Sequence, residues 1–251
     1  MKTVWLSDYL LRQEIANNSS AQALLNALPE RPGLLARLTG LFSPRSRRSV
    51  RETRRRRADL LAQAAEYAED AKYWAKGRGG EDLLSETLGR QLGDEYLLLR
   101  NYTPPAPNHV GGDIDALLLG PLGVIVFEVK AWRGEYLARG GDFYWRPRSH
   151  APWGPARANP IHQALSNVER VKITLRRAGL RHVQVRGVLA VASPDMRVYL
   201  EPPLDAYVFY ACDDGADARW LWRTFNTTPL SPAERQRTSL ALVPHLAAAL
   251  A

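Results

Sequence analysis

A short apolar segment, Asp113 to Lys130, carries three carboxylate side chains and one lysine. Two apolar runs within it are separated by the turn sequence Gly-Pro-Leu-Gly, and this pattern predicts a β-hairpin. A turn that is symmetric about the Pro-Leu pair places Asp115 opposite Glu128. It also places Asp113 opposite Lys130. Because side chains alternate along a strand, the three acids and the lysine then share one face.

This arrangement suits a divalent metal ion. Carboxylates that face each other across a strand pair repel, so they either raise one another's pKa or need a cation. Mg²⁺ is usually held by one or two carboxylates together with water and substrate phosphate. Lys130, two residues from Glu128 on the same face, can orient a water molecule or neutralise charge on a phosphoryl group. The alternative is an ion-pair patch at a half-exposed strand end.

A further carboxylate, Glu81, lies at the start of a short amphipathic helix expected over residues 81–92. It shares one helix face with Leu84, Leu88 and Leu92, which follow at helical spacing. An acid at this position can favour the positive N-terminal end of the helix dipole. It can equally reach the acidic cluster of the hairpin.

The positive charge of the chain is concentrated in one segment. The formal net charge is +8, and residues 44–57 hold eight arginines and a single glutamate. Guanidinium groups match phosphate oxygens and release condensed counterions, so the segment predicts contact with a nucleic acid. Its densest part is Arg54, Arg55, Arg56 and Arg57. A solvated linker and an anionic membrane surface are the alternatives.

The rest of the chain predicts helices and strands in an order typical of a mixed sheet covered by helices. Leucine-rich helical pieces over 1–43 are interrupted by Pro and Gly, and a helix over 58–75 ends at the glycines of residues 77–80. The pair Asn159-Pro160 predicts the start of a helix that extends to Arg177. Strands are expected over 96–102, 113–119, 124–132, 143–145, 183–192 and 207–212, and a closing helix over 231–250.

These elements predict three parts. Residues 1–77 form a helical N-terminal extension that includes the arginine-rich segment 44–57. Residues 78–225 form an α/β domain with a mixed central sheet flanked by helices, and residues 226–251 add a C-terminal helix that packs on it. The N-terminal helices are also a candidate surface for a protein partner or for self-association.

Composition excludes several classes of protein. Hydrophobic residues make up 45% and charged residues 24%, as in ordinary globular proteins. The sequence has neither an apolar run of about 18 residues nor a signal-peptide pattern, so we expect a cytoplasmic protein without a membrane span. The single cysteine, Cys212, excludes an internal disulfide. Motifs of phosphate-loop ATPases, zincins and serine hydrolases are missing from the sequence.

Three stretches of the sequence together resemble the nuclease-related domain (NERD) family, which belongs to the PD-(D/E)xK nuclease superfamily. They are Gly80-Glu81, the hairpin from Asp113 through Glu128-Val-Lys130 to Gly134, and the helix start from Asn159 to Gln163. The resemblance covers about residues 78–193 and leaves both termini outside it. It implies a restriction-endonuclease-like core.

The resemblance also implies an activity and a site. In such enzymes the acid of the first strand and the acid of the Glu-x-Lys strand hold Mg²⁺ or Mn²⁺, and here these are Asp115 and Glu128. Lys130 assists the attacking water, while Glu81 and Gln163 support the site. The implied reaction is hydrolysis of nucleic-acid phosphodiester bonds, with DNA favoured over RNA. A non-catalytic module that binds nucleic acid or a protein partner is the alternative.

Overall fold

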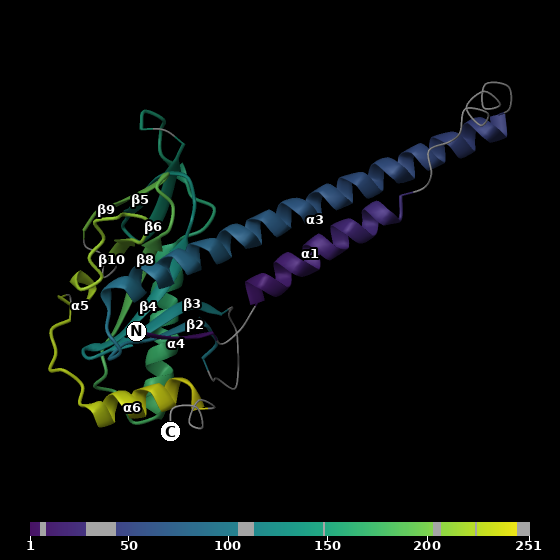
Figure 1. Ribbon diagram of the computed structural model, residues 1–251. Helices are drawn as coiled ribbons and strands as arrows, with labels where there is room; N and C mark the ends of the chain where they lie inside the picture. Colours follow the sequence, from purple (N-terminus) through teal and green to yellow (C-terminus); the bar gives the residue numbers. More distant parts are fainter. Residues whose placement is uncertain are drawn as a thin grey trace. The chain divides into compact units, whose positions relative to one another are not determined.

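The computed structural model describes residues 1–5, 9–28, 44–104, 113–147, 149–202, 207–223 and 225–244 (Figure 1). The chain divides into two compact units. One comprises residues 9–78, and the other combines residues 1–8 with residues 79–251. Among the described residues, no helix is both long enough and apolar enough to cross a membrane.

The smaller unit is a pair of helices. Helix α1 (Tyr9–Asn26) runs beside the part of helix α3 (Pro44–Gln91) that belongs to this unit (Figure 1). Ala21 of α1 and Ala64 of α3 are both buried, and small side chains at such positions let two helices approach closely. The helices are also joined by an ion pair in which Arg78 Nη2 lies 2.7 Å from Glu14 Oε2.

Helix α3 is continuous from Pro44 to Gln91, so the prediction that a helix ends within residues 77–80 is wrong. Glycine inside a helix costs about 1 kcal/mol relative to alanine, an amount that tertiary packing readily outweighs. A Cβ atom on Gly80 would lie 3.2 Å from Ala192 Cβ and 3.4 Å from Val129 Cγ1. The glycine at this position therefore lets the helix pass close to the ends of two strands.

The larger unit is built on a six-stranded mixed sheet with the order β1-β2-β3-β4-β8-β10. Strands β2, β3 and β4 form an antiparallel meander, whereas β1 pairs in parallel with β2, and β8 pairs in parallel with both β4 and β10. The strands are β1 (Lys2–Trp5), β2 (Leu97–Tyr102), β3 (Ile114–Gly120), β4 (Gly123–Lys130), β8 (Val185–Val191) and β10 (Tyr207–Tyr210). The prediction of an α/β fold with a mixed sheet is confirmed.

Strand β1 corrects the expectation that residues 1–77 are wholly helical. Lys2 to Trp5 pair in register with Leu97 to Arg100 at the edge of the sheet. The Met1 ammonium group donates a hydrogen bond of 3.1 Å to the Leu92 carbonyl, which anchors the strand. A four-residue edge strand is too short to carry an alternation pattern, so the sequence contains no signal for it.

Helices cover both faces of the main sheet. The C-terminal part of α3 buries Leu84 and Leu88 against one face, in a core that includes Phe127 of β4. Helices α4 (Pro160–Arg177) and α6 (Pro232–Leu242) cover the opposite face. The two cores fix the position of β4 from both sides, as expected for a central strand with apolar residues in both directions.

Both of these helices begin where the sequence predicts. Asn159 caps α4 by accepting a hydrogen bond of 3.0 Å from the His162 N–H. Ser231 and Glu234 form a capping box at the start of α6. Helix α6 ends at Leu242, short of the predicted end, and residues 245–251 lie outside the described part of the chain.

A second, smaller sheet has the order β7-β6-β5-β9. It consists of β5 (Gly134–Arg139), β6 (Asp142–Arg146), β7 (Gly154–Pro155) and β9 (Met196–Leu200). The sequence patterns predict only β6 of these four. Tyr136, Phe143 and Met196 share a core with Leu189 and Val191 of β8, which joins the small sheet to the main one. A short helix, α5 (Trp220–Arg223), follows β10.

Candidate active site

Strands β3 and β4 form the predicted hairpin in the predicted register. Ala116 pairs with Phe127, so the next step along the ladder brings Asp115 beside Glu128. The Val129 N–H donates a hydrogen bond of 2.6 Å to Asp115 Oδ2. This bond holds the Asp115 carboxylate against the end of β4.

The face on which these acids lie follows from the alternation of side chains. Leu117 of β3 and Val126 of β4 belong to the core beneath α4. Asp115 and Glu128 are each two residues away from them along their strands, so they point to the same side of the sheet. Lys130 extends this row. The apolar strands therefore carry three charged groups to the edge of a covered face.

Lys130 is directed at Glu128. Its Nζ donates a hydrogen bond of 2.5 Å to Glu128 Oε1 and lies 5.6 Å from the centre of the Trp132 ring. Asp113, which the hairpin pattern places opposite Lys130, accepts a hydrogen bond from the Thr103 hydroxyl. Lys130 and Glu128 thus form a close ion pair at the end of β4.

The second oxygen of Glu128 faces a residue that the sequence patterns do not identify. Asn167 of α4 is buried, and its Nδ2 lies 3.5 Å from Glu128 Oε2. Arg170 Nη1 donates a hydrogen bond of 2.8 Å to Asn167 Oδ1 and so orients the amide. Gln163, the supporting residue implied by the resemblance, is one turn earlier on α4, and its side chain is exposed. The signal for Asn167 in the sequence is a polar residue directly beside Val168, one of the apolar residues that α4 buries.

Glu81 lies on α3 and is 5% exposed. It is paired with Arg100 of β2, whose Nη2 lies 3.4 Å from Glu81 Oε2, while Nη1 of the same arginine lies 2.8 Å from Asp82 Oδ1. Arg100 is itself buried. The sequence indicates this residue as a single arginine inside the apolar run of β2. A charged side chain buried at such a position needs a partner of opposite charge.

Residues 76–192 match the family model of the nuclease-related domain. The chain carries a nuclease-related domain over these residues. The family belongs to the PD-(D/E)xK-like nuclease superfamily, which confirms the resemblance inferred from the sequence. Neither the search of curated proteins nor the search of solved structures gave a match.

Burial and nearby negative charge disfavour ionisation of Glu81, Asp115 and Glu128. Burial, followed by the charge of Asp115, raises the pKa of Glu128 to about 7, against the opposing effect of Lys130. Burial also raises the pKa of Asp115, although Lys130 and the Val129 N–H act in the opposite direction. Burial and the nearby Asp115 raise the pKa of Glu81 to about 8. A cation placed among these groups would reverse the trend and favour the carboxylate forms.

The side chains of the nuclease-related domain fit a divalent ion that keeps part of its water shell. Among the described residues, no group of three or more His, Cys, Asp or Glu side chains could enclose a metal. Asp115 and Glu128 are the two carboxylates that could serve as donors, and one or two carboxylates with water and phosphate are the usual surroundings of Mg²⁺. The charge of Asp115 adds to the effect of burial in raising the pKa of Glu128, so a cation between the two carboxylates would relieve that part of the shift.

The arginine-rich segment is helical, not an irregular linker, because residues 44–57 belong to α3. Arg54, Arg55 and Arg56 are exposed, and Arg57 is half-buried. Successive residues of a helix point in directions about 100° apart, so four consecutive arginines spread around the helix. Arg48, Arg51 and Arg55 follow at spacings of three and four and share one side.

Proposed function

We propose that the nuclease-related domain hydrolyses nucleic-acid phosphodiester bonds with the help of Mg²⁺ or Mn²⁺, and that DNA is its main substrate. The observation that carries this proposal is the adjacent pair of half-buried Asp115 and buried Glu128, with Lys130 Nζ 2.5 Å from Glu128. Two adjacent acids and a lysine on one partly covered face cost free energy of desolvation. A catalytic role would account for this cost.

Asp115 and Glu128 are the residues that would hold the metal. When bound, the metal supplies a Lewis acid that withdraws negative charge from the phosphodiester group. The Val129 N–H fixes one oxygen of Asp115, and Asn167 lies against one oxygen of Glu128. Both contacts restrict the rotation of the carboxylates, so they lower the entropy cost of holding a ligand between them.

Lys130 supplies the movable cation. Its ammonium group is paired with Glu128. With a metal held by Glu128, the Lys130 ammonium group would be available to donate hydrogen bonds to a water molecule or to a phosphate oxygen that gains charge in the transition state. Its position above the Trp132 ring keeps the side chain extended toward the same edge of the sheet.

Glu81 takes a supporting role in this proposal. The charge of Asp115 acts on Glu81 and raises its pKa, and Arg100 fixes the Glu81 side chain. A supporting role for Gln163 rests on the family resemblance, whereas Asn167 is the α4 residue in contact with Glu128. The exposed arginines of residues 54–57 are proposed to bind the nucleic-acid backbone.

The test is a cleavage assay with the full chain on single-stranded and double-stranded DNA and RNA. Each substrate is incubated with Mg²⁺, with Mn²⁺ and with EDTA. The proposal expects cleavage with at least one metal and none with EDTA. If every substrate stays intact under all three conditions while binding is measurable, the domain is a nucleic-acid-binding module and the enzymatic proposal fails.

A further inference from the structure

A cavity of about 510 Å³ lies at the end of the β4–β8 pair that is remote from the carboxylates. Val124 pairs with Val185 at the cavity end, and Lys130 pairs with Val191 at the other. Six residue steps of about 3.3 Å separate these ends, so the cavity lies roughly 20 Å from Lys130. It is therefore a different site from the one described above.

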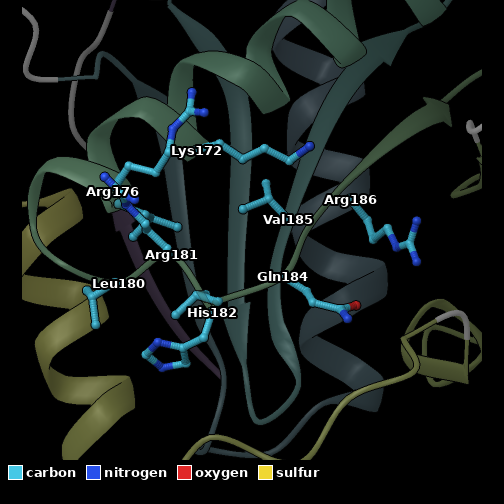
Figure 2. A pocket seen from close by; sticks show the side chains of 10 residues that line it. Lys172, Arg176, Leu180, Arg181, His182, Gln184, Val185 and Arg186 are labelled. Carbon is cyan, nitrogen blue, oxygen red and sulfur yellow. The ribbon is translucent and has the colours of Figure 1, made fainter.

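Basic side chains dominate the lining of this cavity. They come from α4, from the segment that leads into β8, and from β8 itself (Figure 2). Among the described residues that line it, none is acidic and none is Phe, Tyr or Trp. The basic residues are Lys172, Arg176, Arg181, His182 and Arg186.

Carboxylates near the cavity offset only part of this charge. Lys172 Nζ lies 2.8 Å from Glu169 Oε1, and His182 Nε2 lies 3.1 Å from Glu234 Oε1. Two acids thus stand beside four permanently charged cations and one histidine. The side chains of Arg176 and Arg181 are exposed, which leaves them accessible to a ligand. The surplus of positive charge favours an anion.

Gln184 adds an acceptor to the basic lining. Its Nε2 donates a hydrogen bond of 3.3 Å to the Asn226 carbonyl. Its Oε1 is buried and has no hydrogen-bond partner in the part of the chain that the structure describes. A buried acceptor without a partner costs free energy that a ligand donor would recover. A ligand that carries hydroxyl groups as well as negative charge meets both requirements.

We propose that this cavity binds the sugar-phosphate part of a nucleotide. Guanidinium forks match phosphate oxygens, and the cavity volume lies within the range of small-molecule sites. Because the described lining residues include no Phe, Tyr or Trp on which a base would stack, phosphate and sugar are the parts of a nucleotide that the site recognises. A free nucleotide and the 5′ end of a nucleic-acid strand present this same chemistry. The site goes beyond the proposed function, because it needs neither a metal nor cleavage.

The test is equilibrium binding of adenosine diphosphate and of a 5′-phosphorylated oligothymidylate to the full chain in EDTA. The variant Arg176→Gln/Arg181→Gln removes two exposed guanidinium groups from the cavity. The control Arg177→Gln/Arg237→Gln changes the net charge equally at exposed positions that do not line the cavity. Melting temperatures of all three proteins verify that they are folded.

The proposal expects the cavity variant to bind at least one probe about ten-fold more weakly than wild type, and the control to stay within two-fold. A loss with adenosine diphosphate identifies a free nucleotide as the ligand. A loss confined to the oligonucleotide identifies the strand end. Equal affinities of both variants for both probes overturn the proposal, as does a wild-type protein that binds neither probe at millimolar concentration. Because metal is excluded, these results do not depend on the cleavage assay.

Discussion

The carboxylate site and the arginine-rich segment of α3 place their charges in opposite surroundings. Glu128 is 4% exposed and lies between a covered sheet face and a helix, whereas Arg54 to Arg56 project into solvent. Buried charges interact strongly and respond to protons and metal ions, since little water screens them. Exposed charges interact weakly one by one and respond to salt. The two regions are therefore suited to different tasks, chemistry in one and affinity in the other.

The largest expected effect is at Lys130. The substitution Lys130→Met keeps much of the apolar stem and removes the ammonium group. We expect cleavage to slow by at least ~100-fold, as for loss of a positioned catalytic group, while nucleic-acid affinity stays within a few-fold. Single-turnover cleavage and binding in EDTA measure the two quantities.

The exposed Lys76→Met variant is the control for the loss of one positive charge. Equal cleavage rates for Lys130→Met and wild type would remove the catalytic role of this lysine. If Lys130 has only a structural role, Lys130→Met should instead lower the stability by several kcal/mol, because it leaves the buried Glu128 carboxylate without its ion-pair partner.

A second prediction concerns the metal. Mg²⁺ or Mn²⁺ should raise the melting temperature, because a ligand at 100 times its Kd stabilises the folded state by about 2.7 kcal/mol. Asp115→Asn/Glu128→Gln should abolish this rise. The exposed pair Glu95→Gln/Asp214→Asn is the matched control and should keep it. A rise of equal size in both double variants would locate the bound ion elsewhere.

A third prediction concerns Asn167, the α4 residue that lies beside Glu128. Asn167→Ala removes the amide that faces Glu128 Oε2 and should weaken Mn²⁺ binding by about ten-fold, the scale typical of outer residues that orient a metal ligand. Gln163→Ala, one turn away on the exposed side of α4, should change the Mn²⁺ affinity by less than two-fold. Calorimetric titration with Mn²⁺ measures both, and the reverse ranking would favour Gln163 as the supporting residue.

The pH dependence of stability follows from Glu81. Burial first, and then the charge of Asp115, raises the pKa of Glu81 from 4.5 to about 8. Between these values the folded state binds more protons than the unfolded state, so the free energy of unfolding falls as pH rises from about 4.5 to 8. We expect metal-free Glu81→Gln to show a flatter decline of melting temperature over this window, by a few degrees. Parallel curves for variant and wild type would show that Glu81 is ionised throughout.

The smallest expected effect per residue is in the arginine-rich segment. Replacing Arg54 to Arg57 by glutamine should reduce the slope of log affinity against log salt by about one unit for each phosphate group that the variant no longer binds. A control with exposed arginines at residues 90, 177, 219 and 237 replaced should keep the slope. An unchanged slope in the first variant would make the segment a solvated helix without a role in binding.

Local patterns predict the hairpin and the caps. The Gly-Pro-Leu-Gly turn fixes the register of β3 and β4, and Asn159-Pro160 fixes the start of α4, because both signals lie within a few residues. The acid pair and the lysine follow directly from that register. Such features depend on backbone geometry that neighbouring residues determine.

Features that depend on contacts between residues far apart in the sequence could not be predicted. Strand β1 exists because Lys2–Trp5 meets a β2 edge more than 90 residues away. Helix α3 continues through Gly80 because the missing side chain lets it approach Ala192. The contact of Asn167 with Glu128 arises only when α4 is packed on the sheet. Sequence periodicity describes one element at a time and contains none of these pairings.

The most direct test of the catalytic metal site is cleavage by purified wild type and by Asp115→Asn/Glu128→Gln under identical conditions with Mn²⁺. Binding of the same substrate in EDTA shows that the variant still engages nucleic acid. We predict cleavage by wild type that EDTA abolishes, and a loss of at least ~100-fold in the double variant with affinity nearly unchanged. Cleavage at the same rate by both proteins, or by neither, would contradict the assignment of this carboxylate pair as a catalytic metal site.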